Sequence, residues 1–216
     1  MFAPASIADL RRNYSLAGLR RADLAPDPLT QFHTWFAAAL DGGVLEPNAM
    51  TLATVDAAGQ PSSRIVLLKA ADDRGFVFFT NYAGRKGREL ADNPRAALTF
   101  FWPQLERQIC IAGTVTKVSR DESANYFQSR PFGSRLASWA SRQSEPIADQ
   151  ALLHERLAAV RAQYDGAEVP LPPYWGGYAL TPHRVEFWQG RPDRLHDRLQ
   201  YERDAAGGWE ITRLSP

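Results

Sequence analysis

The sequence has few of the features that mark secreted, membrane-spanning and disulfide-bonded proteins. Among its 216 residues there is one cysteine, Cys110, so an internal disulfide is excluded. No apolar run approaches the roughly 20 residues that a membrane-spanning helix needs, and the first residues lack a basic segment followed by a signal-length apolar core. We therefore expect a cytoplasmic protein in which Cys110 packs as a small apolar residue.

An excess of charge of one sign is also missing. Lys and Arg number 25 and Asp and Glu number 24, which leaves no global field to attract nucleic acid or a membrane surface. The four histidines are scattered and far from the cysteine, so no metal site is indicated. A glycine-rich mononucleotide loop and a nucleophile elbow are absent, which counts against dinucleotide-binding and acyl-transfer enzymes. Any cationic function must be local.

What is present favours one domain, residues 1–216, with a sizeable core, since 44% of the residues are hydrophobic. Short strand-like runs are separated by turn-like segments; they cover 50–56, 62–69, 76–80, 95–102, 107–119, 184–189, 194–203 and 209–214. Parallel crossovers would need longer connections than most of these. The spacing therefore predicts antiparallel hairpins that build a barrel.

Helical patterns flank these strands. Asp27 as N-cap, Pro28 at the first helical position and Gly42 past the end delimit one packing helix. Its expected apolar stripe is Leu29, Phe32, Phe36 and Leu40. Residues 121–164 are also helical in pattern, with breaks at Pro131 and Pro146.

Residues 1–25 are predicted to form a mobile N-terminal arm. A capping-box-like start at Ser6 precedes a short helix that carries Arg11 and Arg12, with Tyr14 at its end. A basic, aromatic arm of this kind could close over an anionic ligand. A solvated tail is the simpler alternative.

Two basic pairs suggest sites for phosphate. Arg64 and Lys69 flank a four-residue apolar run that predicts a buried strand, and neither charge is buried cheaply without an anionic partner. The alternative is a core strand whose cations reach water. Arg85 and Lys86 fall near the start of a short helix, where free N–H groups also favour an anion. An exposed helix start explains that second pair equally well.

Two further groups have side chains suited to a phosphorylated ligand. Tyr126 and Arg130 share a helix face, and Pro131 brings the Ser134 hydroxyl round the corner; helix-surface decoration is the alternative. Side chains alternate between the two faces of a strand, so the strand predicted over 194–203 has one basic face and one largely apolar face. One face carries Arg194, His196 and Arg198, and the other Leu195, Leu199 and Tyr201. Adjacent basic groups repel unless solvent, carboxylates or an anionic ligand compensates.

Seven ordered blocks resemble the pyridoxine/pyridoxamine 5′-phosphate oxidase family and run nearly end to end. They are Arg64–Lys69, Phe79–Asn81 with Arg85 and Lys86, Leu105–Gln108, Ser129–Pro131, Trp139 with Gln143 and Ser144, Pro173–Gly177, and Glu186–Gly190 followed by Arg194–Arg198. The resemblance implies a mainly β fold with flanking helices, the antiparallel FMN-binding split β-barrel. It also implies a homodimer that holds FMN at the subunit interface.

The resemblance also assigns the site residues. FMN contacts fall to Arg64, Ile65, Val66, Leu67, Leu68, Lys69, Phe79, Thr80, Arg85, Lys86, Gln108, Gln143, Ser144, Trp188 and Arg198. Substrate contacts fall to Arg11, Tyr14, Lys69, Tyr126, Arg130, Ser134, Arg194 and His196. Of these, Arg194 and His196 are implied to be catalytic, beside the pyridine ring. Ala137–Ser138, where the family often has Gly-Ala, leaves the local loop geometry open.

The implied reaction oxidises the 4′-amine of pyridoxamine 5′-phosphate or the 4′-alcohol of pyridoxine 5′-phosphate to pyridoxal 5′-phosphate. Dioxygen accepts the electrons, hydrogen peroxide is released, and the amine also yields ammonia. FMN carries the hard chemical step, so the protein must chiefly orient two planar rings. A flavin or pyridoxal-phosphate carrier on the same barrel is one alternative. A nicotinamide-fed flavin reductase is another, which the basic groups of 194–198 disfavour.

Overall fold

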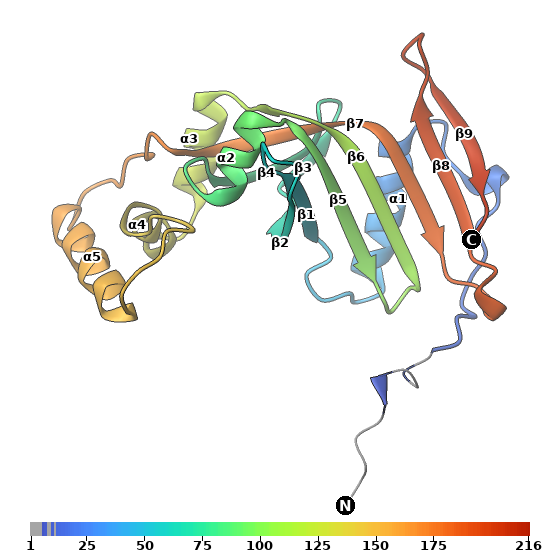
Figure 1. The fold of residues 1–216 in the computed structure, drawn as a ribbon, viewed down its shortest axis with the longest axis horizontal. Helices are drawn as coiled ribbons and strands as arrows, with labels where there is room; N and C mark the ends of the chain where they lie inside the picture. Colours follow the sequence, from blue (N-terminus) through green and yellow to red (C-terminus); the bar gives the residue numbers. More distant parts are fainter. Residues whose placement is uncertain (1–5, 8–9, 11) are drawn as a thin grey trace, which may run out of the picture. The chain divides into compact units, whose positions relative to one another are not determined.

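The computed structural model describes residues 6–7, 10 and 12–216, and strands dominate it (Figure 1). The helical elements are η2 (Arg21–Asp23), α1 (Pro28–Asp41), α2 (Arg85–Asp92), α3 (Arg120–Ser129), α4 (Phe132–Ala140), α5 (Gln150–Gln163) and η3 (Pro192–Arg194). The strands are β1 (Ala49–Val55), β2 (Pro61–Leu67), β3 (Ala70–Asp72), β4 (Gly75–Asn81), β5 (Arg95–Trp102), β6 (Arg107–Lys117), β7 (Trp175–Gln189), β8 (Asp197–Arg203) and β9 (Trp209–Leu214).

The chain forms two compact units, here named after the cavity that each contains. The arm unit comprises Met1–Pro47, Thr99–Ile111 and Arg184–Pro216, and the cationic unit comprises Asn48–Leu98 and Ala112–His183. Strands β5, β6 and β7 contribute residues to both units. No helix in the described part of the chain is long and apolar enough to cross a membrane.

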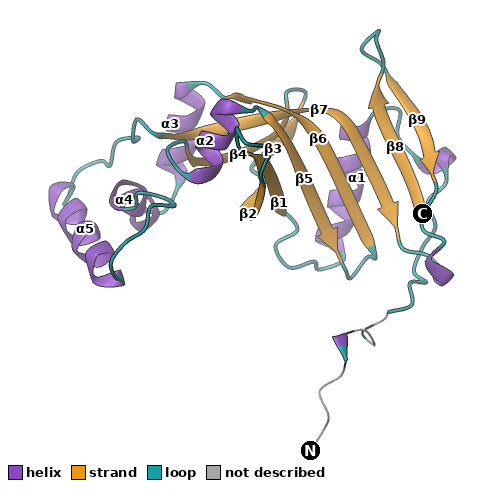
Figure 2. Cartoon of the chain, in the orientation of Figure 1, coloured by secondary structure: helices purple, strands orange, loops and turns teal. Residues whose placement is uncertain are grey.

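In the cationic unit the strand order is β2-β1-β5-β6-β7-β4-β3. β1 pairs antiparallel with β2, and β4 pairs antiparallel with β7, where Phe79 lies opposite Gly177. Helices α4 and α5 pack against each other (Figure 2). A buried cluster joins α3 and α4 to the start of β7; it consists of Phe127, Leu136, Val169 and Trp175. This cluster fixes the helices that carry the predicted phosphate ligands.

In the arm unit α1 packs its aromatic face on the sheet. The Phe32 and Phe100 rings are 5.2 Å apart, and the Trp35 and Phe187 rings meet edge to face at 5.1 Å. These buried aromatics contribute hydrophobic stabilisation of about 25 cal/mol for each Å² of apolar surface removed from water. Strands β7, β8 and β9 are consecutive antiparallel neighbours in this unit.

The predicted limits of α1 are confirmed, but the predicted stripe is partly wrong. The Asp27 side chain accepts a hydrogen bond from Thr30 N, Pro28 opens the helix, and Gly42 is its C-cap. The buried positions include Trp35 and Ala39, whereas Leu40 is 56% exposed. The face of α1 that packs on the sheet is therefore rotated about the helix axis from the face that the predicted stripe defined.

The strand predicted in this region forms as β2, but its predicted burial over 64–69 is wrong. Burial along β2 alternates between exposed and intermediate, and Ile65 is 65% exposed. The strand order explains this, because β2 is an end strand that pairs only with β1 in its unit. Of the apolar run, only Leu68, which follows the strand, is buried.

Three other predicted boundaries are wrong. β3 replaces part of a predicted turn, and β7 begins at Trp175, nine residues before its predicted start. β8 begins at Asp197, so residues 194–196 precede the strand. In the arm, the described residues 12–20 contain no helix, and Arg11 lies outside the described residues. The single-domain prediction stays a prediction.

Replacing the N-cap of α1 should destabilise the protein measurably. Asp27→Ala leaves the Thr30 N–H without its side-chain acceptor, so we expect the free energy of unfolding to fall by about 1 kcal/mol in urea unfolding. Asp41→Ala is the matched control, because an aspartate at the C-terminal end opposes the helix dipole and its removal should not destabilise. Equal losses in both variants would contradict this account of the cap.

Candidate functional site

A cavity in the cationic unit, here the cationic cavity, contains three basic residues: Lys69, Lys86 and Arg130. Its volume is about 510 Å³, and no acidic residue lines it in the part of the chain that the structure describes. The other lining residues are Ile65, Val66, Leu67, Phe79, Thr80, Asn81, Tyr126, Ser134, Ala137, Ser138, Ser141, Gln143 and Trp175. Cations without carboxylate partners make the cavity suitable for an anionic ligand.

The α3–α4 junction places Arg130 in this cavity. Arg130 is the C-cap of α3 and Pro131 the N-cap of α4, so the proline separates two helices as the sequence predicted. Arg130 Nη1 donates to Ser138 Oγ at 2.8 Å, and its Cζ lies 4.7 Å from the Trp175 ring centroid. Burial lowers the pKa of the guanidinium, which nevertheless remains protonated. The Ser134 hydroxyl lines the same cavity, as expected.

Stacked aromatic rings provide a flat wall. The Phe79 and Tyr126 ring centroids are 4.0 Å apart with an interplanar angle of 24°, and Phe79 and Trp175 are 5.6 Å apart at 13°. Gly177 permits this arrangement, because a Cβ there would lie 2.7 Å from Phe79 Cε1. Lys69 Nζ is 5.8 Å from the Tyr126 centroid. A planar surface with cations beside it suits a planar anionic ligand.

Lys86 is a buried cation whose hydrogen-bond partner is neutral. Its side chain lies in the first turn of α2, and Nζ donates to Gln143 Oε1 at 2.7 Å. Burial, then the nearby Arg64 charge, lowers the pKa of Lys86, while Glu89 acts in the opposite direction. Gly84 allows the amide to approach, since a Cβ there would lie 2.7 Å from Gln143 Oε1. A ligand anion would stabilise this ammonium group more than an amide does.

Arg64 has a carboxylate partner and does not line the cationic cavity. Its Nη2 lies 3.2 Å from Glu89 Oε2, and Glu89 also accepts hydrogen bonds from the Thr54 and Ser62 hydroxyls. Arg85, which is exposed, lies with Nε 3.7 Å from Glu89 Oε1. The Glu89 carboxylate thus supplies to Arg64 and Arg85 the negative charge that the sequence analysis expected from a bound phosphate. The FMN contacts assigned to Arg64 and Arg85 stay predictions.

A second cavity, here the arm cavity, lies in the arm unit. It has a volume of about 770 Å³ and is lined by Leu10, Arg12, Asn13, Tyr14, Arg191, Asp193, Arg194 and His196. The His196 ring centroid lies 5.9 Å from that of Tyr14 and 4.6 Å from that of Trp188. His196 Nδ1 accepts a hydrogen bond from Arg191 N at 3.1 Å. The structure therefore groups the predicted Tyr14, Arg194 and His196.

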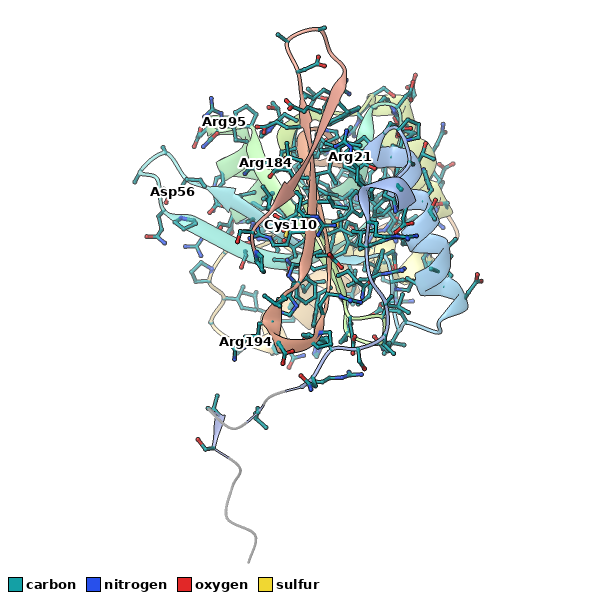
Figure 3. All side chains as sticks on the ribbon, turned by 90° about the vertical axis from the view of Figure 1, so that its right-hand side faces the viewer. Arg21, Asp56, Arg95, Cys110, Arg184 and Arg194 are labelled. Atoms are coloured by element: carbon teal, nitrogen blue, oxygen red, sulfur yellow. The ribbon has the colours of Figure 1, made fainter. Side chains whose placement is uncertain are left out.

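The prediction that Arg194, His196 and Arg198 share one strand face is wrong. Arg194 has a left-handed φ of 61° in the turn η3, which leads into β8 (Figure 3), and His196 also precedes the strand. Arg198 lies on β8 with Nε 2.7 Å and Nη2 3.0 Å from the two Glu186 carboxylate oxygens, a pairing that raises the pKa of Arg198. Leu195 precedes the strand and is 69% exposed, whereas Leu199, which was predicted to share its strand face, is buried.

Several assigned FMN residues lie outside the described linings of these two cavities. Leu68 is buried, Gln108 lies on β6, Trp188 lies on β7, and Ser144 is exposed with a left-handed φ of 70°. Their roles stay predictions. No cluster of three or more metal-ligating side chains occurs among the described residues.

Sequence reasoning assigned no ligand contact to several other lining residues, among them Asn81, Ser138, Ser141 and Trp175 in the cationic cavity, and Asn13 and Arg191 in the arm cavity. Ser138 could have been found, because it lies one helical turn after Ser134 on α4. The arm-cavity residues carried no periodic signal, since they lie in irregular segments.

Comparison with known proteins defines the class. The fold is the antiparallel split β-barrel with flanking helices, as predicted, and a solved PhzG from Burkholderia lata 383, in complex with tetrahydrophenazine-1-carboxylic acid, matches with a TM-score of 0.85. That match has 37% identity and covers 90% of this chain and 95% of PhzG. An FMN-binding protein related to pyridoxamine 5′-phosphate oxidase, from Nostoc punctiforme PCC 73102, shares the fold at 18% identity and a TM-score of 0.68, covering 89% of this chain and 100% of its own.

The chain belongs to the pyridoxamine 5′-phosphate oxidase family. Residues 36–164 match the family model described as pyridoxamine 5′-phosphate oxidase, and residues 175–216 match the pyridoxine 5′-phosphate oxidase C-terminal dimerisation region. The pyridoxine/pyridoxamine 5′-phosphate oxidase of Burkholderia mallei (strain SAVP1) is 59% identical over 213 residues, which is 98% of this chain and 99% of that protein. The corresponding protein of Burkholderia thailandensis is 58% identical with the same coverage.

The buried charge of Lys86 should make ligand-free stability depend on pH. Because the folded-state pKa is lowered, the unfolded chain binds more protons between that lowered pKa and the ordinary value of 10.5, so stability rises with pH across this window. Lys86→Met should therefore be more stable than the ligand-free parent at pH 7, with a gain that shrinks toward pH 10. Urea unfolding at several pH values measures the difference in the free energy of unfolding between the variant and the parent.

Lys117→Met is the matched control for this experiment, because Lys117 is an exposed lysine of the same unit. It should give no pH-dependent gain. A Lys86→Met variant that is less stable than the parent at neutral pH, and equally so at high pH, would show that Lys86 is not an uncompensated buried charge.

Proposed function

We propose that this protein oxidises pyridoxamine 5′-phosphate or pyridoxine 5′-phosphate to pyridoxal 5′-phosphate, with FMN as cofactor and dioxygen as electron acceptor. Hydrogen peroxide is released, and with the amine substrate water hydrolyses the oxidised imine, which supplies the aldehyde oxygen and releases ammonia. The observation that carries the proposal is the cationic cavity, which combines Lys69, Lys86 and Arg130 with stacked aromatic rings and no acidic lining residue among those described. The full-length relatives that are 59% identical support the same assignment.

The residues present fit FMN. Lys86 is a buried ammonium group with only an amide partner, and the adjacent Gln143 and Thr80 supply neutral polar contacts. We propose that these three residues and the strand segment 65–67 hold the cofactor. FMN, when bound, supplies the hydride acceptor that no protein side chain provides. The protein's own part is to bind and orient.

Four residues are proposed to hold the substrate phosphate: Lys69, Tyr126, Arg130 and Ser134, all of which line the cationic cavity. Two cations and two hydroxyl groups offer charge-assisted hydrogen bonds to a dianion. Ser138 supports this arrangement, because its hydroxyl donates to Ser134 O at 3.0 Å and accepts from Arg130. The guanidinium is thereby held in a fixed orientation before ligand arrives, which reduces the entropic cost of binding.

Arg194 and His196 are proposed to act at the pyridine ring. Because His196 Nδ1 accepts from Arg191 N, a neutral imidazole carries its proton on Nε2 and can donate it from there. Arg194 lies exposed beside it in the arm-cavity lining. Both groups would orient the ring and stabilise negative charge.

We further propose a cytoplasmic homodimer with FMN at the subunit interface. The match of residues 175–216 to a dimerisation region supports this assembly. The exposed Ile65 on β2 also supports it, because this apolar side chain lines the cationic cavity and would gain from being covered by a partner.

A second candidate function comes from the PhzG structure, whose ligand, tetrahydrophenazine-1-carboxylic acid, is a ring carboxylic acid. Such a ligand would also suit a cationic cavity with a flat wall. The first proposal is favoured because the oxidase relatives share 59% identity, against 37% for PhzG, and because the two cations assigned to the substrate, Lys69 and Arg130, suit a phosphate dianion better than a carboxylate.

The purified protein should be yellow with a flavin spectrum. Pyridoxamine 5′-phosphate should bleach that spectrum without oxygen, and readmitted oxygen should restore it with release of hydrogen peroxide. A carrier would show no bleaching, and a flavin reductase would bleach with NADPH. Turnover of a tetrahydrophenazine carboxylic acid but not of pyridoxamine 5′-phosphate would favour the second candidate.

Lys69→Ala and Arg194→Ala should each lower kcat/KM for pyridoxamine 5′-phosphate by about tenfold or more, because each removes a charged hydrogen-bond donor. Both side chains are exposed, so the fold should persist, as a thermal unfolding curve would show. Lys117→Ala and Arg184→Ala are the matched controls, since these residues are exposed and line neither cavity. Unaltered kinetics in both test variants would count against the site.

A further inference from the structure

A buried glutamate binds the backbone of the N-terminal arm. Glu106, the last residue of the turn between β5 and β6, is 2% exposed, and its Oε2 accepts hydrogen bonds from Ser15 N at 2.8 Å and Leu16 N at 3.0 Å. Arg12 Nη2 lies 4.0 Å from Oε1. All of these carboxylate contacts come from residues about ninety positions earlier in the chain.

The turn holds this carboxylate in a fixed position. Glu106 has a left-handed φ of 55°, which is uncommon for a residue other than glycine. Its carbonyl oxygen accepts from Gly190 N at 2.8 Å and from Gln189 Nε2 at 3.2 Å, and Gln189 is fully buried. These two hydrogen bonds anchor the backbone of the turn at Glu106 to the end of β7 and the residue after it.

The arm residue next to this contact reaches the arm cavity. Tyr14 packs on Gly190, where a Cβ would lie 2.7 Å from Tyr14 Cγ, and its ring centroid is 5.7 Å from that of Trp188. The same ring lies 5.9 Å from His196. Further along, Leu19 N donates to Asp197 Oδ2 at 3.0 Å, which fixes the other end of the segment.

We propose that Glu106 is a positioning residue that fastens the arm at Ser15 and Leu16 and thereby places Tyr14 against His196. The physical reason is that undocking the arm would exchange the two amide hydrogen bonds of the Glu106 carboxylate for hydrogen bonds to water. Hydrogen bonds to a charged acceptor are the stronger kind, so they favour the docked arm even without ligand. The expected effect on catalysis rests on the proposed function, whereas the effect on the arm does not.

The first test is limited trypsin digestion of the folded, full-length protein. Cleavage after Arg12 reports the population of undocked arm, since proteolysis follows the open state when opening is fast. Glu106→Ala removes both hydrogen bonds and should raise the cleavage rate about tenfold or more. Glu106→Gln keeps a side-chain oxygen as acceptor and should lie between this variant and the parent.

Two further variants make the test specific. Glu46→Gln is the matched control, because Glu46 is also left-handed, with a φ of 47°, but is exposed; it should be cleaved at the parental rate. Ser15→Pro removes one donor from the arm side without altering the buried turn, so it should raise cleavage even if Glu106→Ala fails to fold. Thermal unfolding of each variant confirms that the remainder of the protein is intact.

The second test compares steady-state constants for pyridoxamine 5′-phosphate. Glu106→Ala and Ser15→Pro should raise KM several-fold and leave kcat within about twofold, because the arm contributes binding more than chemistry. Glu106→Gln should partly restore KM. A general loss of packing would instead lower kcat and the thermal midpoint together.

A parental cleavage rate in folded Glu106→Ala and Ser15→Pro would overturn the proposal that Glu106 fastens the arm. A raised cleavage rate with an unchanged KM would overturn the placement of Tyr14 at the substrate. If the parent protein itself oxidises no pyridoxamine 5′-phosphate, the proposed function fails, and the digestion alone decides whether Glu106 holds the arm.

Discussion

In both units of this protein, charged side chains that are removed from water need a group of opposite charge beside them. Glu89 compensates Arg64, and Glu186 compensates Arg198 in a two-point pairing. Lys86 has an amide as its hydrogen-bond partner within the described part of the chain, although its side chain is buried. Arg130, in the same cavity, and Arg107, in the arm unit, also donate to neutral groups, Ser138 and Gln189. Two of these three cations line the cationic cavity, so the missing counter-charge is concentrated there, as a site for an anion would require.

Backbone geometry converts scattered residues into that cavity. Pro131 ends one helix and starts another, so Arg130 and Ser134 face the same space. Gly177 lies opposite Phe79 in the pairing of β4 with β7 and leaves room for the Phe79 ring. Gly84 leaves room for the Gln143 amide to reach Lys86. One proline and two glycines thus set the orientation of side chains at other positions in the sequence.

Local signals in the sequence predicted what depends on near neighbours. The caps of α1, the break at Pro131 and the hairpin spacing are decided within a few residues, and the structure confirms them. The exposure of Ile65 was not predictable, because it depends on β2 lying at the end of a strand order. Arg194 was misplaced because a left-handed turn interrupts the period-two pattern. The contacts of Glu106 with the arm join residues about ninety positions apart, which no local pattern reveals.

The amide partner of Lys86 has a consequence for the life of the protein in the cell. An anion bound beside that ammonium group would stabilise the folded state by mass action, so a newly made chain without it would lie closer to its unfolding threshold than a loaded chain. Chains that remain empty would spend more time open to proteases and be removed first. The availability of the small anionic molecule would then set how much of this protein accumulates, without any dedicated regulator.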